Sequence, residues 1–255
     1  WPAPAMRTLK LTIQYDGGAY VGWQRQAEGT SIQALVEDAL APIEGSRVTV
    51  HGAGRTDAGV HALAQAASVT LTSALPATAI ARALNAVLPA DVRITAVEEV
   101  PAAFHARFSA TGKSYEYRIV NAPFISPFLV RYAWHIPQPL DVDAMRTAGA
   151  YLVGRHDFAA YQGAGSVVQS TERTVESIEW RPGAGADVPL AIRMTGDGFL
   201  RHMVRNVVGA LVEVGAGRWD AGRPLEALRS GRRGHGARTA PAHGLFLVGV
   251  RYGPV

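Results

Sequence analysis

The chain has 255 residues, a formal net charge of +4 at pH 7 and no cysteine. Without cysteine it forms no disulfide, thiolate nucleophile or iron–sulfur cluster, and it lacks the usual ligands of structural zinc. No apolar run approaches the roughly 20 residues that a membrane-spanning helix needs, and the first residues do not resemble a secretory signal. We therefore expect a cytoplasmic protein without a membrane partner. We also expect Met6 to be the natural start and residues 1–5 to be an extension.

Basic residues are concentrated in the last fifth of the chain. Residues 201–255 carry nine Lys and Arg against three Asp and Glu, whereas residues 1–200 carry 16 against 18. A polyanionic partner would explain this asymmetry. The alternative is a GC-rich genome, because the chain has 23 Arg and only 2 Lys. That alternative explains Arg in place of Lys, but it does not explain why acidic residues become rare after residue 200.

The first half of the chain alternates between predicted strands and helices. Residues 9–15 alternate apolar and polar side chains, which predicts a half-buried strand. Thr30 and Gln33 match a capping box, and the apolar spacing that follows predicts a helix ending near Pro42 and Gly45. The remaining elements are predicted strands at residues 48–51, 66–72 and 92–100, and a helix between Pro76 and Pro89.

The second half repeats this order with insertions. Asp141 is expected to cap a helix that continues to Leu152, residues 199–214 form a long helical pattern, and Pro224 begins a short helix. Strands are predicted at residues 114–120, 132–136, 175–180, 190–195 and 245–252.

The predicted order of strand, helix, strand, strand, helix and strand is that of a split βαβ or ferredoxin-like domain. We therefore predict an α+β fold made of two ferredoxin-like, RRM-like α/β units with mainly antiparallel sheets. The predicted domains are residues 6–105 and residues 106–255. Helices on one face of each sheet would leave the other face free to pack or to bind a ligand.

The segment 52–62, GAGRTDAGVHA, places Arg55, Asp57 and His61 among small residues. Its glycines at 52, 54 and 59 permit a positive φ and the close approach of another backbone. A plain turn, with Asp57 bonded to its own backbone, is the simpler explanation for an Asp followed by Gly. The two earlier glycines, the nearby Arg55 and the length of the segment favour a functional loop instead.

The polar residues near Asp57 do not fit the common catalytic motifs. Asp57 and His61 have no third metal ligand at a supporting spacing, since His51 lies in a strand and His105 lies far along the chain. The chain has no serine in a nucleophile-elbow context and no P-loop. The remaining chemistry is that of a carboxylate acting alone, which a nearby Arg would keep ionised.

Residues 104–119, FHARFSATGKSYEYRI, interleave cations with aromatic rings. Rings stack on unpaired bases and cations follow phosphates, so the pattern suits single-stranded nucleic acid. Tyr115 and Tyr117 point the same way along a strand. An aromatic core is an equally good explanation for Tyr117 and a weaker one for Tyr115. The cations are Arg107, Lys113 and Arg118, and the rings are Phe104, Phe108, Tyr115 and Tyr117.

Two further segments lie in the basic last part of the chain. Residues 198–215 form an amphipathic helical pattern in which Arg205 stands among apolar residues. An unpaired guanidinium there would be costly, so we expect an acidic partner for Arg205, with Asp57 as a candidate. Residues 229–244 are basic and rich in glycine, and they either grip a phosphate backbone or form a solvated loop.

Together these motifs resemble the tRNA pseudouridine synthase A family. The similarity is carried by GRTDAGVHA, FHARFSAT, SYEYRI, HMVRNVVG and the closing GLFLVGV, and it runs from residue 15 to the final strand. It implies the pseudouridine synthase fold and an isomerase, active without metal or organic cofactor, that converts uridines 38, 39 and 40 in the anticodon stem-loop of tRNA. It also implies a homodimer that binds tRNA in positive clefts. Gly112, Lys113 and the loop 163–169 depart from the family pattern, which leaves open which of these uridines are modified.

The resemblance implies roles for the positions that match the family. Asp57 matches the catalytic aspartate and Arg205 its basic partner, while Arg55 matches the arginine that helps to displace the target base. Tyr115 matches the tyrosine that stacks on the uracil, and Leu245 matches an apolar wall of the base pocket.

These residues also fit that chemistry on physical grounds. Uridine isomerisation breaks the C1′–N1 bond, turns the detached uracil and rejoins it through C5, without hydrolysis or redox change. A carboxylate can attack the sugar, attack the base or remove a sugar proton, and the sequence leaves these three routes open. The target base must leave its stack, which favours a pocket with an aromatic face and apolar walls. His61 is expected to support the loop structurally.

Two other functions are compatible with parts of the sequence. A non-catalytic RNA-binding protein of paired RRM-like units would need Asp57 to be a turn residue, but the YEYRI strand lacks the RNP pattern of such modules. A hydrolase acting on a nucleoside or sugar would be expected to carry two carboxylates, and the motif offers one.

Overall fold

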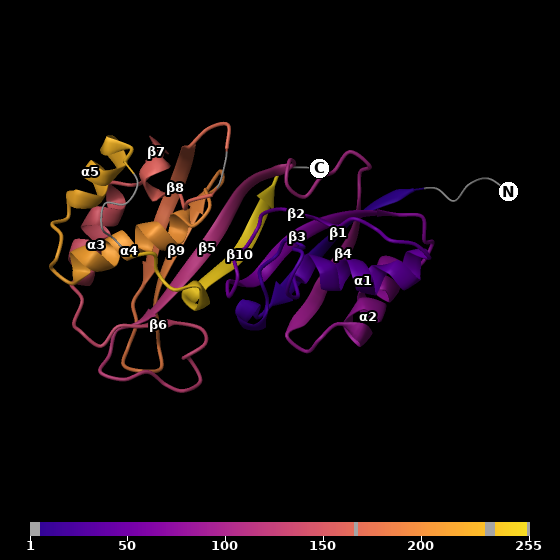
Figure 1. The fold of residues 1–255 in the computed structure, drawn as a ribbon, viewed down its shortest axis with the longest axis horizontal. Coiled ribbons are helices and arrows are strands. Elements are labelled where there is room, and N and C mark those ends of the chain that lie inside the picture. Colours follow the sequence, from indigo (N-terminus) through magenta and orange to yellow (C-terminus); the bar gives the residue numbers. More distant parts are fainter. Residues whose placement is uncertain (1–5, 166–167, 233–237, 254–255) are drawn as a thin grey trace. The chain divides into compact units, whose positions relative to one another are not determined.

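The computed structural model describes residues 6–165, 168–232 and 238–253 (Figure 1). The expectation about residues 1–5 lies outside these ranges. The chain divides into two compact units, one made of Trp1–Thr111 and Leu247–Val255 and the other of Gly112–Phe246. Both units combine strands with helices, so the predicted mixture of α and β structure is confirmed. No helix in the described ranges is long and apolar enough to cross a membrane.

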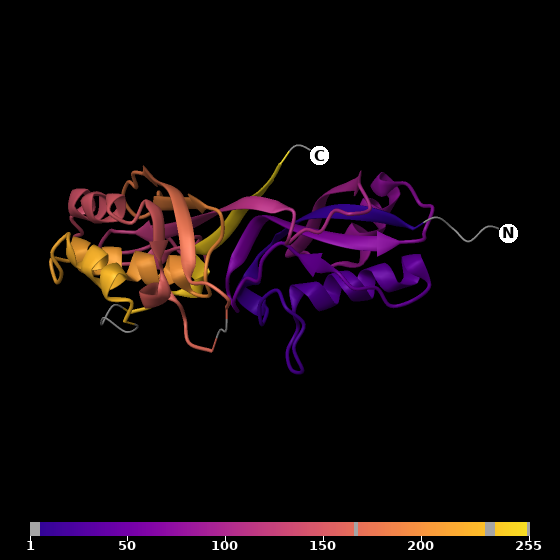
Figure 2. The same cartoon turned by 90° about the horizontal axis from the view of Figure 1, so that it is seen from above.

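Three long strands and two helices make up most of the first unit. The elements are β1 (Arg7–Tyr15), α1 (Ile32–Glu44), β2 (His51–Gly52), β3 (His61–Leu71), α2 (Ala77–Val87) and β4 (Val92–Val100). Strand β1 pairs antiparallel with β4 on one side and with β3 on the other, and the short β2 pairs antiparallel with β3. Helix α1 packs against α2 and runs along the strands (Figure 2).

The alternation of β1 produces the core of this unit. Leu9, Leu11 and Ile13 are fully buried, whereas Lys10 and Thr12 on the opposite face are partly exposed. The helices bury the apolar residues that recur at helical spacing, namely Ile32, Val36 and Leu40 of α1 and Ile80 and Leu84 of α2. The sequence pattern therefore determines which face of the sheet the helices cover.

Helix α1 differs from the prediction at its start, whereas its end at Gly45 matches the prediction. Ser31, and not Thr30, caps the helix, because the Ser31 side chain accepts a hydrogen bond from the amide of Ala34. The helix continues past Pro42 to Glu44 and ends at a C-cap glycine with a φ of 77°. Because Pro42 stands in the last turn, the helix loses one hydrogen bond there and still completes that turn.

Strand β2 is shorter than the strand predicted at residues 48–51. The amide of Val50 donates to the Glu37 carboxylate at 3.0 Å, and the Val50 carbonyl accepts from the Gln33 amide group at 3.0 Å. Side chains of α1 therefore replace a neighbouring strand as partners of the Val50 backbone. Periodicity in the sequence does not reveal partners of this kind.

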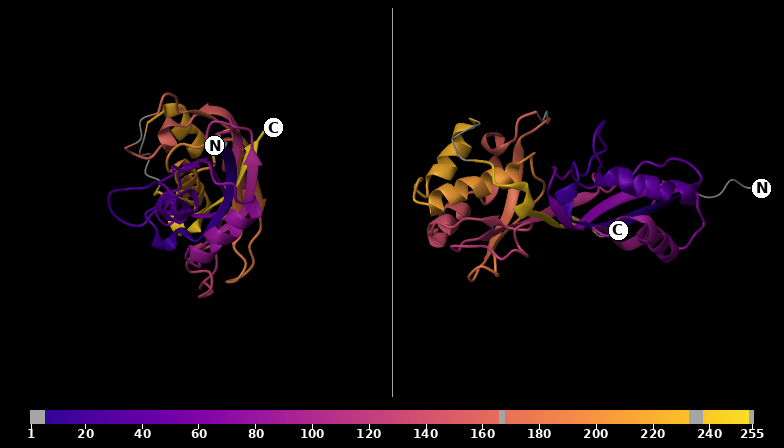
Figure 3. Two further views of the ribbon diagram at one scale, coloured as in Figure 1. Left: turned by 90° about the vertical axis from the view of Figure 1, so that its right-hand side faces the viewer. Right: turned by 60° about the horizontal axis from the view of Figure 1, so that its bottom comes forward.

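The second unit contains most of the remaining elements. They are β5 (Ala110–Val120), β6 (Trp134–His135), α3 (Val142–Ala150), β7 (Gly154–Asp157), β8 (Glu172–Arg181), β9 (Leu190–Gly196), α4 (Met203–Gly215) and α5 (Arg223–Ser230). Strands β5, β9, β8 and β7 pair antiparallel in that order, and β6 runs parallel to β5. Helices α3, α4 and α5 pack against one another (Figure 3). Strand β10 (Leu245–Tyr252) begins in this unit and ends in the first.

Most predicted elements of the second half are present, but some bounds differ: β6 spans only Trp134–His135 of the strand predicted at residues 132–136, and β5 begins at Ala110 instead of Ser114. The strand predicted at residues 245–252 and the cap at Asp141 are confirmed. Helix α4 begins only at Met203, because His202 has a φ of 59° and a left-handed residue interrupts a right-handed helix. Strand β7 is absent from the prediction because its four residues, GRHD, show no apolar alternation.

Candidate active site

Asp57 lies in the loop between β2 and β3, and the backbone of this loop is held from both sides. The amide of Trp23 donates to the Thr56 carbonyl at 3.0 Å, and Gly22 forms an isolated antiparallel bridge with Asp57. The amide of Val60 donates to the Asp57 carbonyl at 3.1 Å, which closes the turn. The partly exposed carboxylate is therefore carried by a fixed backbone.

Glycines outside the motif allow this close packing. Gly22 has a φ of 105°, and a Cβ placed there would lie 2.5 Å from the Thr56 carbonyl oxygen. A Cβ at Gly17 would collide with the Val60 carbonyl. Within the motif, Gly59 has the predicted positive φ, at 78°. Gly52 instead provides room for the indole of Trp23, so the predicted close approach involves a side chain at this position.

A layer of buried side chains supports the loop from below. The Tyr15 hydroxyl and the Thr56 hydroxyl lie 2.8 Å apart, and the Gln65 amide group donates to the Gly54 carbonyl at 2.8 Å. Burial raises the pKa of Tyr15 to about 12, so the phenol stays neutral and acts through hydrogen bonds. Sequence reasoning missed Tyr15, Gln65 and Trp23, which are distant from the motif or read as ordinary strand residues.

His61 lies below the loop and is buried. Its Nδ1 atom is 3.0 Å from the backbone nitrogen of Gly17 and 3.0 Å from a carboxylate oxygen of Asp16. These contacts fix the turn that follows β1 against the start of β3. The arrangement agrees with the predicted structural role for His61.

Arg55 is exposed at the edge of the same loop. Its Nε atom donates to the side-chain oxygen of Gln24 at 3.1 Å. The guanidinium is therefore positioned by a neutral partner from the segment after β1. Because Gln24 is neutral, the positive charge of the exposed Arg55 side chain remains available to a polyanion.

In the second unit, Tyr115 lies on β5 and is 8% exposed. Its ring meets Phe199 edge to face, with 5.3 Å between the ring centroids. Tyr117, on the same face of the strand, is fully buried and donates its hydroxyl to the Pro241 carbonyl at 2.7 Å. Burial also raises the pKa of Tyr117. Tyr117 is therefore a core residue with one specific hydrogen bond. Of its two interpretations, an aromatic core residue and a ring that stacks on nucleic acid, the structure favours the first.

Arg205 lies in the first turn of α4 and is partly exposed. Its Nε atom donates to the Ala240 carbonyl at 2.7 Å, and the Ala240 amide donates to the Arg205 carbonyl at 3.1 Å. The neighbouring Asn206 accepts a hydrogen bond from the Thr239 hydroxyl at 2.7 Å. The start of α4 and residues 239–240 are thus joined by three hydrogen bonds.

Leu245 follows this joined segment and is 5% exposed at the start of β10. Between Ala240 and Leu245 the chain is anchored again, by the hydrogen bond between Pro241 and Tyr117. Gly244 lies so close to the Tyr117 ring that a Cβ would be 2.7 Å from the ring carbon Cζ. Segment 239–245 therefore links α4, β5 and β10, the three elements that carry Arg205, Tyr115 and Leu245.

Glu116 is a buried carboxylate that sequence reasoning missed. It accepts hydrogen bonds from Arg118 and Arg193, each at 3.0 Å, and it also pairs with Arg181. Burial alone would raise the pKa of Glu116, but the three guanidiniums outweigh it and hold the pKa below its ordinary value. Arg118 in turn lies over the ring of Phe246, 4.0 Å from its centroid, beside Leu245. The available sequence signal was the presence of charged residues within predicted strands or directly after one, namely Glu116 and Arg118 on β5, Arg181 on β8 and Arg193 on β9.

The basic segment at residues 229–244 is described only in part, since residues 233–237 lie outside the described ranges. Arg229 and Arg232 are exposed, and Arg238 lies 4.8 Å from the centroid of the Trp134 ring. Among the described residues, no group of three or more His, Asp and Glu could hold a metal ion. The two regions around Asp57 and Arg205 thus offer carboxylate, guanidinium and aromatic groups.

Comparison with known proteins gives a match over most of the chain. The model of a family described as tRNA pseudouridine synthase matches residues 11–109 and 148–253. A tRNA pseudouridine synthase A of Syntrophotalea carbinolica is 43% identical over 249 residues, which cover 98% of this chain and 98% of that protein. One of Acetivibrio thermocellus is 40% identical over 247 residues, which cover 97% and 100%.

A solved structure is similar at a much lower level. The crystal structure of an archaeal box H/ACA ribonucleoprotein complex contains a chain with 14% identity and a TM-score of 0.35. The similarity covers 80% of this chain and 44% of that chain. A score of this size carries no argument about the fold.

Proposed function

Because the chain belongs to the tRNA pseudouridine synthase family, we propose that it modifies uridines in the anticodon stem-loop of tRNA with Asp57 as the catalytic carboxylate. Membership of the family makes the chain an isomerase that converts uridine to pseudouridine. The proposal adds the RNA region, uridines 38, 39 and 40, and the residues that carry the chemistry.

The loop around Asp57 is the observation that supports the proposal most strongly. The Gly22 bridge, the Trp23–Thr56 hydrogen bond and the close turn at Val60 keep the loop backbone in one conformation. The target base must leave its stack before it reaches Asp57. Because the loop is already ordered, little conformational entropy is lost when the carboxylate meets that base. An ordinary surface turn needs no supporting layer of this kind.

The reaction itself conserves every atom of the nucleotide. The C1′–N1 bond breaks, the uracil turns, a C1′–C5 bond forms, and the proton on C5 passes to the N1 position. Asp57 supports this sequence by attacking the sugar, by attacking the base or by removing a sugar proton. All three routes need an ionised carboxylate and a site that excludes water from the cleaved intermediate.

The remaining residues take roles in binding and positioning under this proposal. Arg55, exposed and held by Gln24, displaces the target base. Tyr115 stacks on the uracil, and Leu245 forms an apolar wall of the base pocket. Arg205 is the basic group that keeps Asp57 ionised. We propose no metal ion or organic cofactor.

The partners and organisation follow the same proposal. tRNA binds to basic surfaces, the protein acts in the cytoplasm, and the active form is a homodimer, which sedimentation at working concentration tests. The order β1, α1, β2, β3, α2, β4 with β1 between β4 and β3 supports a ferredoxin-like first unit. We extend this to two ferredoxin-like domains, residues 6–105 and 106–255, within the pseudouridine synthase fold.

The proposal is tested by comparing the wild type with Asp57→Asn on an unmodified tRNA transcript. We expect pseudouridine at anticodon-arm positions with the wild type and a loss of at least about 10³-fold in rate with the variant. The matched control is Asp143→Asn, because Asp143 has a 92% exposed side chain in α3 and lies outside the candidate site. This control should keep the wild-type rate.

Three results would overturn the proposal. Retained turnover by Asp57→Asn would remove the catalytic role of this residue. RNA binding without any pseudouridine would indicate a binding protein, and release of free uracil would indicate a hydrolase. Mapping pseudouridines in tRNA from cells with and without the protein identifies which of the three uridines are substrates.

A further inference from the structure

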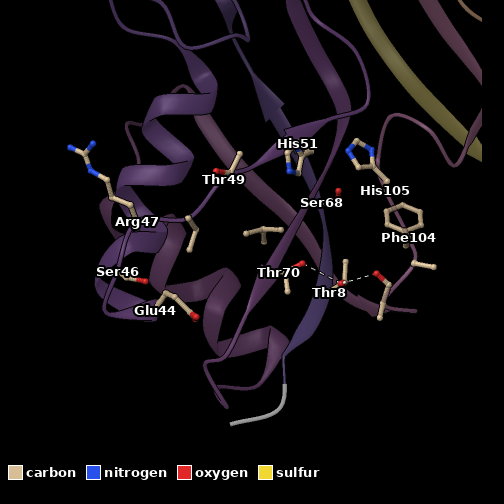
Figure 4. A pocket seen from close by; sticks show the side chains of 14 residues that line it. Thr8, Glu44, Ser46, Arg47, Thr49, His51, Ser68, Thr70, Phe104 and His105 are labelled. Carbon is tan, nitrogen blue, oxygen red and sulfur yellow. Dashed lines mark hydrogen bonds between the residues drawn. The ribbon is translucent and has the colours of Figure 1, made fainter. Parts of the chain in front are cut away.

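The first unit has a hollow of about 520 Å³ on the sheet face that α1 and α2 do not cover (Figure 4). Ser68 and Thr70 of β3 form its floor. Its walls come from residues 46–49, after α1, and residues 102–105, after β4. Asp57 does not line this hollow, so the hollow is separate from the candidate active site.

Three aromatic side chains form a stack that begins at the hollow, which His51 and His105 line, and continues to Phe108. The centroids of His51 and His105 are 4.9 Å apart, and those of His105 and Phe108 are 4.4 Å apart. The rings are tilted by 33° and 37°. We call His51, His105 and Phe108 the ring ladder. The two histidines, far apart in the sequence, face each other at the rim in Figure 4.

Hydrogen bonds keep the middle ring neutral. The Nδ1 atom of His105 accepts from the amides of Arg107 and Phe108 at 3.1 and 3.4 Å, which places the ring hydrogen on Nε2. Burial lowers the pKa of His105, and the neighbouring His51 and Arg107 lower it further. His105 therefore presents an uncharged aromatic ring at neutral pH.

The segment that carries the ladder is fixed to the sheet. The amide of Ala106 donates to the Ser68 hydroxyl at 3.0 Å, and Ala106 packs between Ala53 and Ala66. The amide of Ser109 donates to the His105 carbonyl at 2.9 Å. Phe108 is nevertheless 75% exposed. The Phe108 ring is therefore open to solvent on a backbone segment that is held in place.

The charges around the hollow favour an anionic partner. Arg47 stands at the rim with its guanidinium pointing outward, and the Arg107 guanidinium lies 5.5 Å from the centroid of Phe108. Glu44 is the acid that lines the hollow, and its carboxylate accepts from the Thr72 amide and hydroxyl and from the Ser73 amide. Those hydrogen bonds outweigh burial and lower the pKa of Glu44. Its oxygens are therefore engaged by groups of the protein, while both arginines are exposed.

We infer that the ring ladder stacks an unpaired nucleobase of the RNA substrate outside the nucleotide that reacts at Asp57. Stacking accepts any base, because every base has a π face, and the arginines attract the adjoining phosphates. The exposed hydroxyl groups of Thr49 and Thr70 in the hollow offer hydrogen bonds to a ribose. The inference rests on the proposed function, from which it takes RNA as the substrate.

The experiment measures RNA binding and pseudouridine formation by wild type, Phe108→Ala and Phe108→Trp. The probes are an unmodified tRNA transcript and a single-stranded uridine decamer. We expect Phe108→Ala to raise Kd and KM for the transcript by about 5- to 100-fold, with kcat at saturating RNA unchanged. Phe108→Trp should stay within about threefold of the wild type because it keeps a ring. The decamer should show the same order of affinities.

The matched control is Phe128→Ala. Phe128 is 85% exposed, in the loop before β6, and forms no ring contact among the described residues. Its removal should leave Kd within about twofold of the wild type, since it takes no part in the ladder. Equal losses for Phe108→Ala and Phe128→Ala would overturn the inference.

The outcomes separate this inference from the proposed function. A wild type that makes pseudouridine, together with an unchanged Kd and KM for Phe108→Ala, would overturn the inference alone. A wild type that binds the transcript without making pseudouridine would overturn the proposed function, while the affinity comparison would still decide the inference. A Phe108→Ala variant with altered sedimentation and unchanged RNA affinity would assign the ladder to a protein contact and overturn the inference.

Discussion

The loop around Asp57 and the region around Arg205 reach a defined geometry in different ways. The Asp57 loop is a contiguous motif of eleven residues, GAGRTDAGVHA, and glycines fit it closely against the segment after β1. Tyr115, Arg205 and Leu245 come from three elements, and the segment 239–245 links those elements by hydrogen bonds. The first region depends on backbone shape, and the second depends on side chains that anchor a connecting segment.

This difference determines how each region should respond to mutation. A change in backbone freedom should damage the Asp57 loop, whereas loss of one polar side chain should damage the region around Arg205. Single substitutions that alter either the backbone or one side chain therefore test this contrast.

Arg205 should show the largest effect after Asp57 itself. We expect Arg205→Ala to lower kcat by about 10²- to 10³-fold, because it removes both a fixed charge and the anchor of Ala240. Arg205→Lys keeps the charge and loses the Nε hydrogen bond, so it should recover part of the rate. If the two residues act as a unit, adding Arg205→Ala to Asp57→Asn should cause little further loss. Additive losses would separate their roles.

Gly22→Ala should destabilise the first unit. The residue has a φ of 105°, and its Cβ would press on the Thr56 carbonyl, so we expect a loss of about 3 kcal/mol in the free energy of unfolding. Gly45→Ala is the control, since Gly45 has a φ of 77° with nothing within 4 Å of a Cβ. Its cost should be about 1 kcal/mol. Denaturant titration measures both, and equal costs would refute the close-packing argument.

Glu116→Gln tests whether a polar side chain stabilises the second unit, as the comparison predicts. At pH 7 we expect a loss of about 2 kcal/mol, because three guanidiniums lose a buried carboxylate while remaining partly in water. The folded pKa lies below the ordinary value of 4.5, so this stabilisation is complete above that pH and disappears as the pH falls through the folded pKa. The difference in the free energy of unfolding between the wild type and Glu116→Gln should therefore become smaller at acidic pH.

The control for Glu116 is Glu226→Gln. Glu226 is exposed and pairs with Arg223 across one helical turn, at 3.2 Å. Surface pairs of this kind contribute about 0.5 kcal/mol or less. If the difference in the free energy of unfolding between the wild type and Glu116→Gln does not depend on pH, the negative charge of Glu116 is not the cause of the stabilisation.

Salt dependence should show the smallest change for a single residue. If the basic last fifth of the chain binds tRNA, the affinity should fall steeply with salt through counterion release. Replacing the exposed Arg229 by Gln should reduce the slope of log K against log salt by about one. The control is Arg146→Gln on α3, outside the basic segment, which should leave the slope unchanged. A flat dependence for the wild type would contradict binding by this part of the chain.

The sequence predicted the elements well where apolar residues alternate or recur at helical spacing. The strands at residues 92–100 and 245–252 and the cap at Asp141 have the predicted positions. It failed where a side chain replaces a backbone partner, as Glu37 does for Val50. It also failed at His202, because a left-handed residue inside an apolar repeat leaves the hydrophobic spacing intact.

The sequence predicted the motif of the candidate site but not the contacts that its residues make in the fold. The position of Asp57 in a glycine-rich loop between strands follows from local sequence. The supporting Tyr15, the contact of Gly52 with Trp23 and the cluster around Glu116 depend on pairs far apart in the chain. A single sequence does not show which distant residues lie in contact. The roles predicted for Arg205, Tyr115 and Leu245 therefore came from the family resemblance.

The indole of Trp23 has a practical consequence for following the enzyme at work. It is 2% exposed, lies against Gly52, and its backbone amide holds Thr56, the residue before Asp57. Tryptophan emission moves to longer wavelength when water reaches the ring. In a variant with the other tryptophans replaced by Phe, Trp23 fluorescence becomes a built-in optical probe of the loop. It would report in real time whether the loop opens as RNA arrives.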